Sequence, residues 1–147
     1  MGILLVRHAE AVQEQAGIDD AARWLSPHGR AQARAAAALV AQKGLTFSRF
    51  FASPRVRAVQ TAELFASVLA FTEPVEVLAS LSYTEPAEQA VRALSKLGGV
   101  EHVVAFGHMP TLATIAARLA ATEHAGFGLA EAVWIDQGRV VWAVAPR

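Results

Sequence analysis

The feature that most constrains the fold of this chain is a regular alternation of short aliphatic runs with longer amphipathic segments. Residues 3–6, Ile-Leu-Leu-Val, are continuously apolar, which is typical of a strand covered on both faces. Similar runs predict strands at residues 47–52, 75–78 and 102–106. Parallel strands need a long crossover, usually a helix, so this alternation indicates βαβ units and a mainly parallel sheet.

The segments between these runs carry signals that begin and end helices. The Ser-Pro pair at residues 26–27 can begin a helix, because serine caps the first turn and proline is tolerated at its first position. The Ser-Pro pair at residues 53–54 repeats this signal, and Gly44 and the glycines at 98–99 are suitable stops. The sequence therefore predicts helices at residues 27–43, 53–70, 86–97 and 110–121.

The last part of the chain follows a different pattern. Residues 130–135 and 139–145 flank an Asp-Gln-Gly turn, which predicts a β-hairpin. The polar stretch at residues 10–23 is expected to be a loop. A chain of 147 residues fits one domain, so we expect a single α/β domain over residues 1–147, with three α/β/α layers around a mainly parallel central sheet.

Charge and residue usage exclude several classes of function. Thirteen basic and thirteen acidic side chains cancel, which removes the main electrostatic reason to expect nucleic acid or an anionic membrane as a partner. The chain has no cysteine, so thiolate catalysis and Cys-ligated zinc are excluded. No apolar run approaches the ~20 residues of a membrane span, and the apolar start is too short for a signal peptide. These features predict a soluble cytoplasmic protein.

Polar residues suited to chemistry follow three of the predicted strands. Arg7 and His8 come directly after the first strand, and His108 follows the fourth. Arg55 and Arg57 lie at the start of the helix after the second strand. Ligand sites in such sheets lie at the carboxyl ends of the strands, so we expect these side chains to converge on one rim.

Two histidines and several arginines at one rim indicate phosphoryl transfer. Arginine offers a phosphate bidentate hydrogen bonds, and a helix N-terminus adds backbone N–H groups. Arg55 and Arg57 are unfavourable against the dipole of their helix, which favours an anion bound there. A neutral imidazole can attack phosphorus near neutral pH, and a second, protonated histidine can stabilise the transferring oxygens. This scheme requires no metal and no other cofactor.

Four segments together resemble the histidine phosphatase (phosphoglycerate-mutase-like) superfamily. Leu-Val-Arg-His-Ala-Glu at residues 5–10 is similar to its first signature, and Ser-Pro-Arg-Val-Arg-Ala-Val-Gln-Thr-Ala at 53–62 to its second. Phe-Gly-His-Met-Pro at 106–110 resembles the third motif. Arg-Trp-Leu-Ser-Pro-His-Gly at 23–29 is similar to a segment of SixA-type phosphohistidine phosphatases. The resemblance spans most of the chain and implies a phosphoglycerate-mutase-like fold and a metal-independent phosphatase.

The resemblance also implies roles for individual residues. His8 matches the nucleophile that carries the phosphoryl group as a covalent phosphohistidine. Arg7 and Arg57 match the arginines that bind phosphate, and His108 matches the second histidine of the pocket. Arg55 falls on a variable position of the motif and therefore ranks below Arg57.

The general acid is the point at which the chain departs from many relatives. Relatives that cleave phosphate esters place an acidic residue shortly after the third strand, to protonate the leaving alcohol. Here Tyr83 stands at that place, with Glu85 nearby, and Glu14 replaces an asparagine that is common near phosphate. A phosphohistidine leaves as imidazole, which solvent can protonate, so such a substrate needs the acid less. The chain also lacks the insertions that cover small substrates, and an open site suits a protein side chain.

Three functions stay open. The first is a phosphatase acting on protein phosphohistidine. The second is a phosphomonoesterase for a small phosphate ester, in which Glu85, Glu10 or Glu14 would serve as the acid. The third is a non-catalytic phosphate-binding module, against which the presence of both His8 and His108 argues.

The remaining histidines and the tryptophans are expected to have structural roles. The histidines interpreted as structural or surface residues are His28, His102 and His124. The tryptophans interpreted as packing residues are Trp134, Trp142 and Trp24, of which Trp24 is near enough to the pocket loop to line it.

Overall fold

The computed structural model describes residues 2–97, 101–121 and 126–146. In chain order its strands and α-helices are β1 (Gly2–Arg7), α1 (Pro27–Ala41), β2 (Arg49–Ala52), α2 (Val56–Val68), β3 (Glu76–Val77), α3 (Ala87–Lys96), β4 (His102–Gly107), α4 (Thr111–Ala120), β5 (Ala132–Asp136) and β6 (Arg139–Val144). Two 3-10 turns, η1 (Asp20–Ala22) and η2 (Ala79–Leu81), lie in the loops after β1 and β3. Each strand and helix predicted from the sequence is present, with shifts at the ends.

The strands form one mixed sheet in the order β3-β2-β4-β1-β5-β6. β1 pairs in parallel with β4, and β2 pairs in parallel with β3 and β4. β5 runs antiparallel to both β1 and β6, so the predicted hairpin forms one edge of the sheet. The mainly parallel sheet is therefore confirmed, and β1 lies inside it, between β4 and β5.

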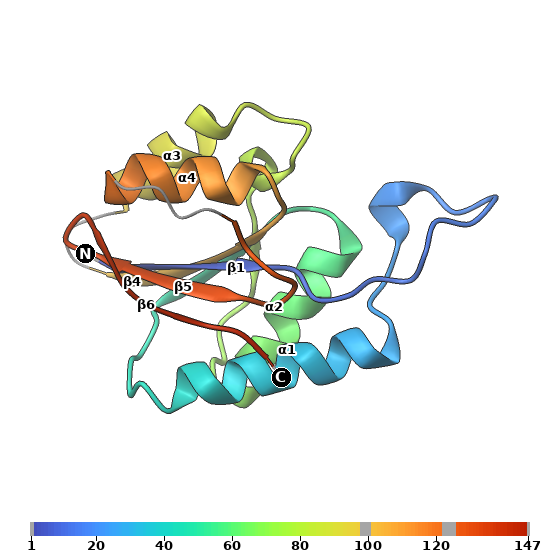
Figure 1. The fold of residues 1–147 in the computed structure, drawn as a ribbon, viewed down its shortest axis with the longest axis horizontal. Coiled ribbons are helices and arrows are strands. Elements are labelled where there is room, and N and C mark those ends of the chain that lie inside the picture. Colours follow the sequence, from blue (N-terminus) through green and yellow to red (C-terminus); the bar gives the residue numbers. More distant parts are fainter. Residues whose placement is uncertain (1, 98–100, 122–125, 147) are drawn as a thin grey trace.

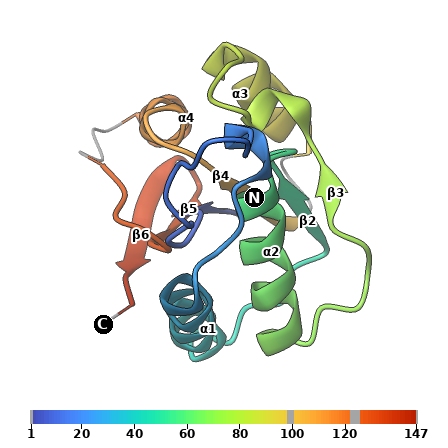
Figure 2. The same ribbon diagram turned by 90° about the vertical axis from the view of Figure 1, so that its right-hand side faces the viewer.

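Helices cover both faces of this sheet (Figures 1 and 2). In β1, Leu4 and Val6 belong to the core shared with α1 and α2, whereas Ile3 and Leu5 belong to the core shared with α3 and α4. All four side chains are buried, because a strand covered on both faces has no solvent side. The three-layer α/β/α arrangement is thus confirmed. Among the described residues, no helix is long and apolar enough to cross a membrane.

The two Ser-Pro signals behave differently in the structure. Ser26 is the N-cap of α1, and its Oγ accepts a hydrogen bond from the Gly29 N–H at 3.0 Å. The helix start predicted at residues 53–54 is wrong, because α2 begins at Val56 and its N-cap Arg55 makes no side-chain cap bond. The Ser53 hydroxyl instead contacts His108, which directly follows β4 and belongs to the site described below.

The remaining aromatic residues divide between core and surface. The ring of His102 packs edge-on against Trp134 at 5.0 Å, and Trp134 stacks on Trp142. Trp24 was also predicted to be a packing residue, but it is not part of the core: its side chain is 40% exposed on the loop before α1. His28 is exposed on α1. The predictions for His124 and for the glycine stop at 98–99 concern positions outside the described residues.

Candidate active site

Three neighbouring strands end together at one rim of the sheet. β2, β4 and β1 are adjacent and parallel, so their carboxyl ends coincide. Just beyond the strands, the His8 N–H donates to Gly107 O and the Ser53 N–H donates to Phe106 O, both at 3.0 Å. The ring centroids of His8 and His108 are 5.1 Å apart. The structure therefore brings together two histidines that are 100 positions apart in the sequence.

The backbone around His8 fixes the proton on its ring. Nδ1 lies 2.7 Å from Ala9 O, and a carbonyl can only accept, so Nδ1 carries the proton and donates it. In the neutral ring the lone pair is therefore on Nε2. Burial, together with the neighbouring Arg57 and Arg7 charges, lowers the pKa of His8 to about 4. The ring is consequently neutral at neutral pH and is able to act as a nucleophile.

Three buried nitrogens of the site have no hydrogen-bond partner among the described residues. They are Arg7 Nε, Arg57 Nε and His108 Nδ1. Other atoms of the same side chains are held firmly: Arg7 Nη1 donates to Phe127 O at 2.9 Å, and Arg57 Nη1 donates to Asp20 O at 2.8 Å. The two arginine nitrogens are donors, and buried donors without acceptors are costly, so an oxyanion is the ligand that this arrangement suits.

Asp20 is the site residue that sequence reasoning missed. Its Oδ2 accepts from Arg55 Nη1 at 2.6 Å, from the Tyr83 hydroxyl at 2.7 Å and from Arg57 Nη2 at 3.3 Å. Its Oδ1 accepts from Arg23 Nε at 3.0 Å. The Tyr83 hydroxyl and the arginines hold the pKa of Asp20 well below its usual range, so this carboxyl is ionised and not a proton donor. The only signal in the sequence was an acidic residue three positions before Arg23.

Arg55 and Arg57 have different surroundings. Arg57 is 3% exposed, on the first turn of α2. Arg55 turns to Asp20 and Ser82, and its guanidinium lies 4.3 Å from the ring centroid of Tyr83. The Tyr83 ring in turn meets the His108 ring edge-on at 5.5 Å. Arg55 is thus part of an outer network around Asp20.

Two backbone segments hold Arg7 and His8 from the side. The Ala9 N–H donates to Thr61 Oγ1 at 3.1 Å, and the Thr61 hydroxyl donates to Arg57 O at 2.7 Å, so α2 fixes the chain after His8. On the opposite side, the Ala130 N–H donates to His8 O at 3.2 Å. The sequence did not predict that the segment before β5 would bond to His8, because this contact forms only when the sheet assembles.

The three carboxyls predicted as candidate general acids, Glu10, Glu14 and Glu85, are not bonded to the site histidines or arginines in any contact between described residues. Glu10 Oε1 accepts from the Ser26 hydroxyl at 2.7 Å, which ties this carboxyl to the start of α1. Glu14 and Glu85 are exposed. Glu85 lines a hollow of about 290 Å³ that Arg55 also lines but neither site histidine does. Within residues 2–97, 101–121 and 126–146, no three His, Asp or Glu side chains are grouped as metal ligands would be.

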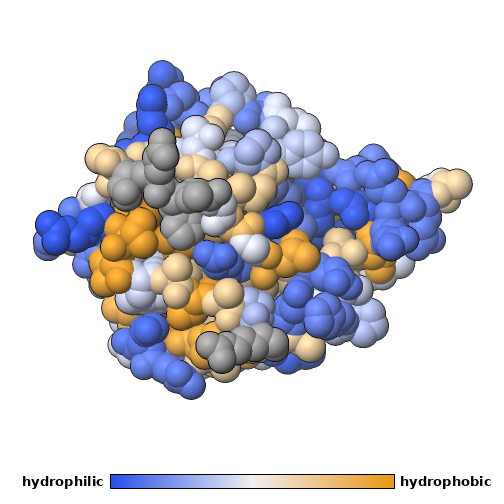
Figure 3. All heavy atoms as spheres, in the orientation of Figure 1, coloured by the Kyte–Doolittle hydropathy of each residue, from blue (hydrophilic) through white to orange (hydrophobic). Residues whose placement is uncertain are grey.

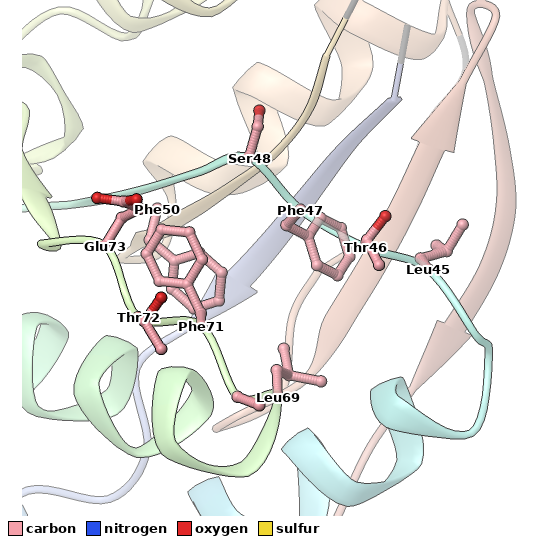
Figure 4. A pocket seen from close by; sticks show the side chains of 10 residues that line it. Leu45, Thr46, Phe47, Ser48, Phe50, Leu69, Phe71, Thr72 and Glu73 are labelled. Carbon is pink, nitrogen blue, oxygen red and sulfur yellow. The ribbon is translucent and has the colours of Figure 1, made fainter.

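The loop of residues 10–23 stands beside the rim and makes a largely hydrophilic lobe, at the right in Figures 1 and 3. A separate hollow of about 380 Å³ lies at the opposite end of β2, lined in part by Phe47, Phe71 and Glu73. Figure 4 shows the rings of Phe50 and Phe71 against each other in it, and they are stacked at 4.1 Å. This hollow contains none of the rim residues, so the candidate site is the rim.

Known structures share this fold over nearly the whole chain. The protein histidine phosphatase SixA in complex with tungstate has a TM-score of 0.90 and 24% identity, covering 99% of this chain and 97% of that one. A protein assigned as the phosphohistidine phosphatase SixA of Agrobacterium tumefaciens has a TM-score of 0.86 and 24% identity, over 99% and 98%. A mutant phosphoserine phosphatase of Entamoeba histolytica in complex with phosphoserine has a TM-score of 0.67 and 16% identity, covering 95% of this chain and 93% of that one.

Comparison of the sequence itself leads to a family. No curated protein sequence matches the chain. The profile of the histidine phosphatase superfamily (branch 1) matches residues 3–82, which is more than half of the 147 residues and includes Arg7, His8 and Arg57. The chain belongs to the histidine phosphatase superfamily, branch 1.

Proposed function

We propose that this chain is a phosphatase that removes the phosphoryl group from phosphohistidine on a protein, through a covalent intermediate on His8. The observation that carries the proposal is the state of the His8 ring, whose Nδ1 donates its proton to Ala9 O, which leaves the lone pair of the neutral ring on Nε2. The unpartnered Arg7, Arg57 and His108 nitrogens support a phosphoryl group bound beside it. The similarity in fold to a SixA structure that holds tungstate, a tetrahedral oxyanion like phosphate, is consistent with this.

The proposed reaction has two steps. The Nε2 lone pair of His8 forms a bond to phosphorus while the P–N bond of the substrate breaks, and the substrate imidazole leaves and takes a proton from water. Water then attacks the phosphorus, the bond to His8 breaks, and inorganic phosphate is released with the ring restored. Arg7, Arg57 and His108 donate to the phosphoryl oxygens, where charge is spread in the transition state.

The choice of phosphohistidine depends on the surroundings of the described carboxyls considered as acids. Asp20 is the carboxyl bonded to site residues Arg57 and Tyr83, and it is ionised. Glu10 is bonded to Ser26, and Glu14 and Glu85 are exposed. An alkoxide leaving group needs a positioned proton donor, which typically contributes 10²–10⁴-fold, whereas imidazole does not. The surroundings of these carboxyls therefore support a P–N substrate over a phosphate ester.

The test is a comparison of substrates on the purified chain. A protein carrying phosphohistidine and a panel of small phosphate esters are offered separately, and phosphate release is measured. We expect release from phosphohistidine, loss of this release in His8→Ala, and no change in His28→Ala, which alters an exposed histidine on α1. Turnover of esters without turnover of phosphohistidine would overturn the proposal in favour of a small-molecule phosphomonoesterase.

A second measurement separates catalysis from binding. The chain is incubated with a ³²P-labelled phosphohistidine protein and quenched in alkali, and label is sought on His8. An acid-labile, alkali-stable adduct that is missing in His8→Ala supports the covalent step. Binding of phosphate with neither an adduct nor turnover would indicate a non-catalytic phosphate-binding module.

A further inference from the structure

Ser53 is a buried hydroxyl at the rim that the mechanism above does not use. It directly follows β2, is 0% exposed, and its backbone N–H continues the ladder to β4. Its Oγ lies 2.8 Å from Nε2 of His108, which is itself 2% exposed. The pair is therefore closed to water, and each atom in it has to be satisfied by the protein.

The protons around Ser53 can be placed from the neighbouring contacts. The Arg55 N–H donates to Ser53 Oγ at 3.3 Å, so the hydroxyl oxygen already accepts one bond. Among the described residues, His108 Nε2 is the one acceptor within reach of the Ser53 proton. If Nε2 carried a proton instead, the Ser53 proton would be buried without an acceptor, at a cost of about 1–3 kcal/mol.

This arrangement decides the state of the other ring nitrogen. Burial lowers the pKa of His108 to about 3, so the free ring is neutral and has one proton to place. With Nε2 accepting from Ser53, that proton sits on Nδ1, which is buried and without a partner among the described residues. A protonated Nδ1 can donate to an oxyanion, whereas a bare Nδ1 lone pair would repel one.

We propose that Ser53 is a positioning residue that keeps the Nδ1 proton of His108 available to the oxygens of the transferring phosphoryl group. This inference rests on the proposed function. A hydroxyl suits the task because its oxygen accepts from the Arg55 N–H while its proton is donated to Nε2. Ser53 thus determines which ring nitrogen of His108 carries the proton, as the Ala9 carbonyl does for His8.

The matched variants are Ser53→Ala, Ser53→Thr and Ser80→Ala. Ser53→Ala removes the hydroxyl with little change in volume, and Ser53→Thr keeps it. Ser80→Ala makes the same chemical change at another buried serine, whose Oγ has no partner among the described residues. Thermal unfolding of each variant checks that it is folded.

The direct readout is ¹⁵N NMR of the histidine rings, which distinguishes protonated from bare nitrogens. Signals of His108 are assigned by their loss in His108→Asn. We expect His108 protonated on Nδ1 and bare on Nε2 in the wild type, Ser53→Thr and Ser80→Ala, and a mixture or the reverse in Ser53→Ala. Titration with inorganic phosphate should then shift the Nδ1 signal of the wild type. Protonation on Nε2 in the free wild type, or no shift of Nδ1 on phosphate binding, overturns the proposal.

The kinetic readout is kcat and KM with whichever phosphorylated substrate the wild type turns over. Ser53→Ala should lower kcat about 10- to 100-fold with a smaller change in KM, because the lost alignment matters most in the transition state. Ser53→Thr should recover most of this loss, and equal kcat in Ser53→Ala and wild type would overturn the proposal. Since the NMR experiment uses no substrate, a wrong choice of substrate and a wrong role for Ser53 give different results.

Discussion

The inner rim and the outer network of this site are held by different forces. At the rim, His8 and His108 sit one residue beyond β1 and β4, and backbone hydrogen bonds or buried partners fix their rings. In the outer network, Asp20, Arg55 and Tyr83 come from loops and are held by one shared carboxylate that is only partly shielded from water. Hydrogen bonds to the backbone fix the orientation of a side chain, whereas an ion pair tolerates several orientations of its two partners.

This difference teaches which side chains should tolerate change. A residue held by the sheet has one geometry, so a small change of its hydrogen bonding removes its function. A residue held by a partly shielded ion pair on a loop, such as Arg55 with Asp20, contributes charge more than direction. The predictions below set matched variants of the rim against variants of the network.

The largest effect is expected from Arg57→Lys at the rim. Lysine keeps the charge but loses the planar donors of arginine, including the buried Nε, so kcat/KM should fall about 10²–10³-fold. The matched variant Arg55→Lys changes the same group in the network and should lower kcat/KM by less than about threefold. Equal losses in the two variants would mean that the network binds the substrate as directly as the rim.

The next effect concerns stability in acid. The folded state keeps His8 and His108 neutral, with pKa values lowered to about 4 and about 3 from an ordinary value near 6.5. The unfolded chain binds more protons below pH 6.5, so this stability is present above that pH and is lost as the pH falls through 4. The free energy of unfolding should drop by at most about 1.4 kcal/mol per pH unit for each ring.

Urea unfolding between pH 7 and pH 4 measures this slope. His108→Gln should give a shallower slope than the wild type, because one of the two rings no longer gains a proton on unfolding. His28→Gln, at an exposed position, should leave the slope as it is. A slope unchanged in His108→Gln would mean that His108 is protonated in the folded protein.

A smaller effect of the opposite sign is expected from Asp20→Asn. The amide has the same shape, and Arg57 keeps its bond to the backbone oxygen of residue 20, so the change is mainly the loss of one negative charge. Inorganic phosphate should bind about three- to tenfold more tightly, measured by calorimetry at low salt. Asp19→Asn, at the exposed neighbouring position, is the control. Weaker binding in Asp20→Asn would instead make Asp20 a residue that orients Arg57.

The smallest effect is expected from Tyr83→Phe. The ring stays between Arg55 and His108, and only the hydrogen bond from the hydroxyl to Asp20 is lost. kcat/KM should change by about twofold or less for phosphohistidine, because the leaving imidazole takes its proton from water. A loss confined to phosphate esters would show that the Tyr83 hydroxyl donates the proton to an alcohol.

The local part of this molecule could be predicted from the sequence. The apolar run of β1, the serine cap of α1, and the positions of Arg7 at the end of β1 and of His8 and His108 just after strands follow from patterns within a few residues. Such patterns are set by periodicity and by the carboxyl ends of strands, which need no knowledge of distant contacts. The prediction failed at Ser53, where a Ser-Pro pair with the local form of a helix start has its partner just beyond the end of another strand, at His108.

Only the tertiary structure decided which of these residues meet and in what state. Asp20 bonds to Arg57 and Tyr83 across 37 and 63 positions, and Ser53 bonds to His108 across 55. Within the sequence, Asp20 is one acidic residue in a loop, and both histidines have ordinary pKa values. Packing of three parallel strands side by side buries the His108 ring, partly buries the His8 ring and supplies hydrogen-bond partners to both. The neutral state of His8 and the proposed Nδ1 proton of His108 therefore depend on the assembled sheet. The sequence alone therefore determined the fold class and the chemical groups at the rim, and their assembly determined the protonation on which the proposed chemistry depends.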